Sequence, residues 1–334
     1  MEEKIDFVIL WVDGNDEAWL KEKKKYQPNL ENNENNNKSR FRDWDNLKYW
    51  FRMIEKNANW VNKIYFITWG HIPSWLDTTN KKLRIIKHSD YIPNEFLPTY
   101  NSNTIEMNLF RIEELSENFV LFNDDMFMPN KTTKSDFFKN NLPCECYSEV
   151  EIHSNKANDI YIHTLLNNMS IINKYFNKKN VYKKDFFKYI NFKYGFKDNL
   201  STLMLLPFKN FSLIVNKHLP VSLKKSVLKQ LWEIEPEAMV KSSLNRFRDL
   251  SDISQYLIRY YQICSGNFVP RKSNFGMYYR LENNNNHIIK NLEKNKYKIV
   301  CFNDTPTVTD FENSKKTLND YLEKKYPNKS SFEK

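Results

Sequence analysis

The sequence predicts an α/β protein with a mostly parallel sheet and a helical insertion. Two observations predict this class: short apolar runs rich in Ile, Val, Phe and Tyr, and stretches of helical periodicity between them. Alternating strands and helices are typical of a parallel sheet covered by helices. The predicted strands occupy residues 5–12, 63–69, 83–87, 119–122 and 297–302.

Two helices are predicted between these strands. Residues 44–56 place Leu47, Trp50 and Ile54 at helical spacing. Residues 103–115 also show an apolar face, and Asn103 followed three residues later by Glu106 resembles a capping box.

Three segments organise the chain. Residues 1–147 are the first part of the α/β core and contain a polar loop, ENNENNNK, at 31–38. Residues 148–284 read as a mainly helical insertion rich in Lys, Asn and aromatics. Residues 285–334 return to the core and end in a charged helix after residue 310.

Composition narrows the class of protein. A chain of 334 residues that is 40% hydrophobic can build a real core, which excludes a fully disordered chain. The net charge of +10 suits either a solvated surface or attraction to polyanions such as nucleotides, phosphosugars or an anionic membrane face. No standard nucleic-acid motif occurs, so we expect no nucleic-acid partner.

The cysteines and the N-terminus bear on location. Four cysteines, of which only Cys144 and Cys146 are close, provide neither a zinc site nor a disulfide framework. The acidic N-terminus lacks the features of a signal peptide, and no apolar run reaches about 18 residues. We expect a cytoplasmic protein, at most peripheral at the inner face of the cell membrane.

Carboxylates follow three of the predicted strands. Ligands of open α/β sheets bind beyond the carboxyl ends of the strands, so parallel strands would bring these tips to one edge. Clustered carboxylates need a proton or a cation between them, and a divalent cation shared with a diphosphate meets that need. The tips are Asp13 and Asp16, then Asn123, Asp124 and Asp125, and finally Asn303 and Asp304.

Four stretches resemble the conserved regions of the Stealth phosphotransferases, in the order of that family. The first is IDFVILWVDGND, and the second runs from RFRDWDNLKYW to LFNDDMFM over residues 40–128. The third is HLPVSLKKSVLKQLWEIEPEA with RFRDLSDIS, and the fourth is YKIVCFNDT. The family includes bacterial capsule polymerases and the animal enzyme that tags lysosomal glycoproteins with N-acetylglucosamine-1-phosphate. This chain is similar to the capsule branch. Residues 149–217 cannot be matched to the family residue by residue, and they are expected to set the acceptor.

The resemblance implies a reaction and a fold. A hexose-1-phosphate or N-acetylhexosamine-1-phosphate would pass from a UDP-sugar to a hydroxyl of a glycan or glycolipid, with release of UMP, during synthesis of capsular or cell-surface polysaccharide. The cofactor would be a divalent cation, Mg²⁺ or Mn²⁺. The sheet would be Rossmann-like or glycosyltransferase-A-like.

Three residues match catalytic positions of the family. Asp125 and Asp304 are expected to coordinate the metal, or one of them to act as the base on the acceptor hydroxyl. His218, in the HLP motif before a helix predicted from Pro220, is expected to transfer a proton or donate to a phosphoryl oxygen.

Six further residues are expected to bind substrate. Arg248 of RFRDLSD matches an Arg of the family and suits a phosphate, because its planar group presents a fork of donors. Arg42 has two open interpretations, a substrate contact or an ion pair at a helix entry with Asp43. Asn101, beside Ser102 in the TYNS loop, is expected to contact sugar or phosphate. The other expected contacts are Asp13, Asp16 and Asn123.

Two other functions stay open from the residues alone. FVLFNDDMF would equally serve a metal-dependent nucleotide-sugar glycosyltransferase that releases UDP. The basic charge would suit a non-enzymatic protein that binds glycans or membranes, although such a protein has little use for three acidic strand ends.

Overall fold

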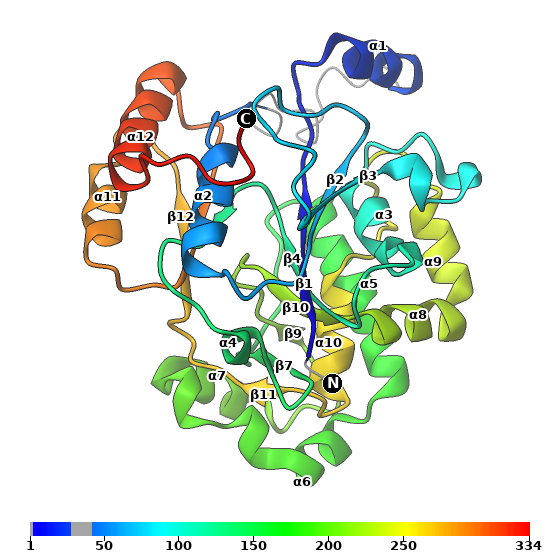
Figure 1. Cartoon of the computed structure of the whole chain (residues 1–334). Helices are drawn as coiled ribbons and strands as arrows, with labels where there is room; N and C mark the ends of the chain where they lie inside the picture. The colour runs from blue at the N-terminus through cyan, green and yellow to red at the C-terminus, as the bar shows by residue number, and fades with distance from the viewer. Residues whose placement is uncertain (1–2, 28–41) are drawn as a thin grey trace.

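A computed structural model of the chain describes residues 3–27 and 42–334 (Figure 1). The predicted polar loop at 31–38 lies outside the described residues. Four strands of the main sheet are parallel, which confirms the predicted α/β class, and β10 is antiparallel to its neighbour β4. The order β10-β4-β1-β2-β3 joins β1 (Ile5–Leu10), β2 (Ile64–Thr68), β3 (Leu83–Lys87), β4 (Asn118–Phe122) and β10 (Val221–Lys224).

Helices cover both faces of this sheet. Along β1, Ile5, Phe7 and Ile9 point into one core, and Val8 points into the other, because successive side chains of a strand alternate between faces. Because both faces of the central strands are buried, these strands are mainly apolar. Asp6 of β1 is an exception, and its carboxylate accepts from Asn62 and from the amides of Lys63 and Ser116.

The first core packs against helices on one side of the sheet in Figure 1. The predicted apolar stripe of Leu47, Trp50 and Ile54 is buried there, which confirms this helix. The predicted C-terminal helix is confirmed as well. These helices are α2 (Leu47–Asn57), α11 (Asn286–Glu293) and α12 (Phe311–Lys325).

The second core lies on the opposite face and is built largely by residues 148–284. The predicted helical character of this segment is confirmed. Its helices are α5 (Ile160–Tyr175), α6 (Lys178–Tyr189), α7 (Phe196–Leu205), α8 (Lys225–Ile234), α9 (Pro236–Ser243) and α10 (Tyr256–Cys264).

The last predicted strand does not join the main sheet. β13 (Ile299–Asn303) pairs in parallel with β12 (Gly276–Arg280) and antiparallel to β5 (Met126–Phe127) in a separate sheet. The chain turns sharply after β4, and the amide of Phe302 donates to the carbonyl of Asp125 at 2.8 Å. The expectation that all three acidic tips belong to one sheet is therefore wrong.

Two helix predictions are corrected. The helix expected over 103–115 is α3 (Ser102–Met107) followed by a 3-10 turn, Leu109–Arg111. Its N-cap is Asn101, whose side chain accepts from the amide of Asn103, so the Asn103–Glu106 capping box is wrong. The helix expected from Pro220 begins only at Lys225, because β10 intervenes.

The remaining elements are short. Among the described residues, none of the helices combines the length and apolarity that a bilayer crossing requires. The division at residues 147 and 284 stays a prediction, although β10 and β12 connect its middle segment to both sheets. The remaining short elements of the fold are α1 (Glu17–Tyr26), α4 (Lys134–Phe137), β6 (Phe138–Lys139), β7 (Leu142–Glu145), β8 (Glu149–Val150), β9 (Leu213–Ile214) and β11 (Val269–Pro270).

Candidate active site

The site is located at the carboxyl edge of the main sheet. β1 and β4 are parallel neighbours, so the loops that carry Asp13 and Asp125 leave the sheet at the same edge. β10 runs the opposite way and begins at this edge, which brings His218, three residues before it, toward Asp125. The antiparallel strand that the sequence did not predict is therefore what joins two predicted catalytic residues.

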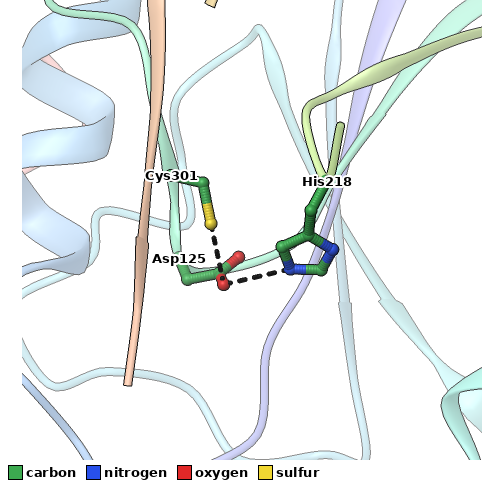
Figure 2. A group of neighbouring side chains, drawn as sticks. All are labelled: Asp125, His218 and Cys301. Atoms are coloured by element: carbon green, nitrogen blue, oxygen red, sulfur yellow. Dashed lines mark hydrogen bonds and ion pairs between the residues drawn. The ribbon is translucent and has the colours of Figure 1, made fainter. Parts of the chain in front are cut away.

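Asp125, His218 and Cys301 form a compact group in which the carboxylate is central (Figure 2). The Nε2 atom of His218 lies 3.3 Å from Oδ2 of Asp125, and the Cys301 thiol donates to the same oxygen at 3.1 Å. Oδ1 of Asp125 is buried and has no hydrogen-bond partner among the described residues. A buried acceptor without a donor is costly, so this oxygen is ready to bind a ligand.

The loop that carries His218 is strained and firmly held. His218 has φ +46°, a conformation that non-glycine residues seldom adopt, and such strain is concentrated at functional sites. The buried Arg259 donates to the Val215 carbonyl and the Asn216 side chain, both at 3.1 Å. The Tyr256 hydroxyl lies 3.5 Å from Nδ1 of His218. Both ring nitrogens of His218 thus have a neighbour that positions the imidazole: Asp125 at Nε2 and Tyr256 at Nδ1.

The pKa of His218 is raised above its ordinary value. Desolvation lowers this pKa, but the hydrogen bond and charge of Asp125, with a smaller contribution from Glu106, outweigh desolvation. An imidazole whose protonated form is favoured by a neighbouring carboxylate is a stronger base, which suits it to proton transfer.

Glu106 is a member of the site that sequence reasoning missed. Its side chain is buried on α3, and desolvation raises its pKa to about 7, opposed by the charges of Arg248 and His218. The signal in the sequence is a lone acid between Ile105 and Met107, and its spacing from Asn103 indicates only a helix cap. Cys301 was also missed, and a cysteine within the apolar run KIVCF offered no signal.

The carboxylates beside Asp125 repel one another. The side chain of Asp124 reaches solvent, yet dense surrounding protein, followed by the charges of Asp125 and Asp43, raises its pKa to about 7. Burial and the charges of Asp45 and Asp13 also raise the pKa of Asp43. Raised carboxyl pKa values in a cluster mark a place where a cation would be stabilised.

Asp304 has a different partner from Asp125. Arg42 donates to it through Nε at 2.9 Å and Nη2 at 2.7 Å, and the guanidinium also binds the carbonyls of Thr305 and Val308. Arg42 therefore makes an ion pair, but with Asp304 and not with Asp43. The predicted roles of Asp304 in metal binding and of Arg42 in substrate binding stay predictions.

The first acidic loop is organised locally. Asp13 accepts from the amide of Asn15 at 2.9 Å, and Asp16 caps α1 through the amide of Trp19 at 2.7 Å. The His71 ring accepts from the amide of Asp13 at 2.8 Å, so this histidine supports the loop. Asn123 is half-buried at the end of β4. Substrate contacts of Asp13, Asp16 and Asn123 stay predictions.

Asn101 is fully buried. Its amide donates to Asp252 at 2.9 Å and its oxygen caps α3, so this side chain positions a loop, and its contact with sugar or phosphate stays a prediction. Asp252 also accepts from Asn103 and Asn245, which ties this loop to α3. Arg248 is exposed and donates to the Ser102 hydroxyl at 2.9 Å. Its positive charge lowers the pKa of both Glu106 and His218.

An open cavity of about 630 Å³ lies against His218. Its aromatic and polar lining suits a sugar, since ring faces pack on sugar C–H groups and polar tips bind hydroxyls. The cavity is lined by residues that include Tyr161, Lys217, Tyr278, Tyr297 and Asn303.

Comparison with known proteins identifies the class. Models of three conserved regions of the Stealth proteins match: region 1 at residues 3–31, region 2 at 40–145 and region 4 at 290–334. The capsular polysaccharide phosphotransferase WcwK of Streptococcus pneumoniae is 46% identical over 99% of this chain and 98% of its own. The exopolysaccharide phosphotransferase cps2G of Lactiplantibacillus plantarum is 40% identical over 99% of this chain and 96% of its own.

A solved structure of the galactosyltransferase LgtC with donor and acceptor sugar analogues can be aligned with this chain. The alignment covers 96% of this chain and 95% of the LgtC chain. Its TM-score of 0.38 and identity of 9% are too low to support a statement about fold or activity.

The relatives and the region models define an enzyme of the phosphotransferase class. The chain belongs to the Stealth family, and the resemblance found in its sequence is confirmed.

Proposed function

We propose that this enzyme transfers a sugar-1-phosphate from a UDP-sugar to a hydroxyl of a glycan or glycolipid, releasing UMP, during synthesis of a capsular or cell-surface polysaccharide. The observation that carries the proposal is the Asp125–His218 pair at the wall of the cavity. The names of the relatives support phosphoryl transfer and capsule synthesis.

In this reaction the acceptor hydroxyl attacks the β-phosphorus of the donor. A bond forms between the acceptor oxygen and that phosphorus, the bond from phosphorus to the bridging oxygen breaks, and UMP leaves with the bridging oxygen. The hydroxyl proton passes to the His218–Asp125 pair, because the hydrogen bond and charge of Asp125 favour the protonated imidazole and raise its pKa. Arg248, held by Ser102, is the candidate donor to the phosphoryl oxygens.

The residues fit a divalent cation. Asp125 offers its unpartnered Oδ1, and Asp124 lies where neighbouring carboxylates raise its pKa. A bound cation would neutralise the charge of the diphosphate as the nucleotide leaves. Oxygen ligands favour Mg²⁺ or Mn²⁺. We assign Cys301 to orienting Asp125, because burial raises the pKa of its thiol well above the ordinary value and it donates to that carboxylate.

The competing reaction is glycosyl transfer with release of UDP, and the position of one phosphorus atom distinguishes them. UDP-glucose, UDP-galactose and their N-acetylhexosamine counterparts, each labelled with ³²P at the β-position, are incubated with the enzyme and an oligosaccharide prepared from the capsule. Sugar-1-phosphate transfer moves the label into the glycan and forms unlabelled UMP. Label retained in UDP would show glycosyl transfer, and D125N serves as the inactive control.

A further inference from the structure

Helix α7 presents apolar side chains to solvent and polar side chains to the protein. Thr202 accepts from the amide of Glu149 at 3.1 Å, and Ser201 donates to the carbonyl of Glu149 at 2.6 Å. On the outer side, Phe196 is 80% exposed and Met204 is 69% exposed. Surface helices of soluble proteins have the opposite arrangement, so the outer face of α7 requires a partner.

The exposed apolar surface extends beyond α7. We define the apolar patch as Phe187, Phe192, Phe196, Leu203, Met204 and Phe208, all exposed. Phe192, in the 3-10 turn before α7, is 105% exposed and therefore projects into solvent. In Figure 1, α6 and α7 lie at the lower edge of the molecule, away from the core of the main sheet. Gathered apolar exposure of this kind marks an interaction surface.

The segment beneath the patch is rigidly held. Lys178, at the start of α6, is buried and its Nζ atom lies 2.8 Å from Oε1 of Glu149. The same Nζ donates to the carbonyl of Leu205, at the end of α7, at 2.6 Å. A buried charge pair therefore ties both ends of the segment together, and the apolar face is directed outward by the fold itself.

Lysines surround the patch. Between residues 178 and 210 the only acids are Asp185 and Asp198, which lie 3.7 Å and 3.3 Å from the Nζ atoms of Lys188 and Lys217. The segment thus carries positive charge that its own acids do not balance. Its exposed lysines are Lys179, Lys183, Lys184, Lys193, Lys197 and Lys209.

We propose that the apolar patch and its lysines dock the enzyme onto the headgroup region of an anionic lipid bilayer. Lysine is depleted in protein–protein interfaces, whereas projecting aromatic side chains flanked by lysines are typical of surfaces that lie in a membrane interface. The attraction of lysines to anionic headgroups matches the charge of this segment. A second copy of the chain, or another protein, fits the apolar side chains but not the lysines.

The patch borders the cavity beside His218. Lys217, which lines the cavity, pairs with Asp198 of α7, and the Ser273 amide donates to the carbonyl of Lys193 at 3.0 Å. Docking here would place the cavity close to the membrane surface. A lipid-linked acceptor could then enter the cavity directly from the membrane. This consequence rests on the proposed function, whereas the proposed membrane binding does not.

Flotation of the full chain with phosphatidylglycerol–phosphatidylcholine vesicles tests the proposal, without any substrate. We expect binding that weakens with salt and is lost on pure phosphatidylcholine. F192S/F196S/M204S should lower the partition coefficient at least tenfold. K183Q/K197Q/K209Q should lower it by about 100-fold, because each lysine contributes roughly fivefold. Matched controls are V240S on α9 and K290Q/K294Q/K316Q, which lie on α11, at its C-cap and on α12. These controls should bind like the wild type.

All substituted side chains are exposed, so thermal midpoints should stay within a few degrees and confirm folding. Equal loss of binding in K290Q/K294Q/K316Q would overturn the proposal by showing a general effect of charge. Absence of vesicle binding, together with a dimer in sedimentation velocity that F192S/F196S/M204S abolishes, would overturn it in favour of a second copy. UMP release from a UDP-sugar, measured without vesicles, reports separately on the proposed function.

Discussion

Asp125 and Asp304 each follow a buried strand, but their carboxylates have different surroundings. Asp125 faces a titratable imidazole and a thiol and retains one oxygen without a partner, whereas Asp304 is held by two nitrogens of Arg42. The first arrangement can exchange a proton or bind a cation, and the second neutralises its charge within the protein. The comparison indicates that two similar strand-end motifs have different roles. Asp125 is suited to the reaction, whereas Asp304 is suited to stabilising the fold.

Metal removal should have the largest effect. Exhaustive chelation is expected to abolish transfer, and Mn²⁺ or Mg²⁺ should restore it, because Oδ1 of Asp125 has no partner among the described residues and the pKa of the adjacent Asp124 is raised by desolvation and by nearby carboxylates. D125N should weaken Mn²⁺ binding, measured by titration calorimetry without substrate, much more than D304N. Equal shifts in both variants would make Asp304 a second ligand and remove the proposed difference, and full turnover after chelation would contradict a cation altogether.

Substituting His218 should reduce kcat by about 10²–10⁴-fold, the usual contribution of a proton-transfer group. H218N is preferred to H218A because Asn tolerates the positive φ of this position. We expect its thermal midpoint and its affinity for the UDP-sugar to stay near those of the wild type. An activity loss that only follows unfolding would return His218 to a structural role.

On the other side of the comparison, D304N should act mainly on stability. Loss of one partner from a half-buried, bidentate ion pair is expected to lower the free energy of unfolding by about 1–3 kcal/mol. R42Q should cost a similar amount, and the double variant should cost little more, which a double-mutant cycle by urea unfolding measures. A large fall in kcat at unchanged stability in D304N would show a catalytic carboxylate.

Glu106 should link stability to pH. Its folded pKa of about 7 exceeds its ordinary value of 4.5, so the proton it retains stabilises the fold below pH 4.5, and this contribution is lost as the pH rises to 7. E106Q should therefore gain about 1–3 kcal/mol relative to the wild type between pH 5 and pH 8. Urea unfolding at both values measures the difference. The raised pKa of His218 acts in the same direction, so H218N is the necessary control.

The smallest effect is expected from Cys301. C301A removes the thiol that donates to Oδ2 of Asp125, while its neighbour His218 still contacts the same oxygen. We expect kcat to fall only severalfold, with the histidine pKa, followed by NMR, rising slightly as the carboxylate loses a donor. A loss as large as that of H218N would place the thiol itself in the reaction.

The sequence by itself determined the α/β class and much of the element order. The runs around Ile5 and Ile64 are mainly apolar, which is typical of strands covered on both faces, and the stripe on α2 has clear helical spacing. The motifs at Asp125 and His218 were visible as well, because the family resemblance distinguishes them from ordinary turns and loops.

Only the tertiary structure decided how these motifs meet. β10 is four residues long and its antiparallel pairing depends on β4, about 100 residues earlier, so no local pattern could place His218 beside Asp125. Cys301 and Glu106 lie within apolar stretches, where a local pattern cannot distinguish packing from chemistry. Arg42 could have paired with its neighbour Asp43, but the fold brings Asp304 within 2.7 Å. Local periodicity encodes which face of an element is buried, whereas the partner of each charge is set by long-range pairing of strands.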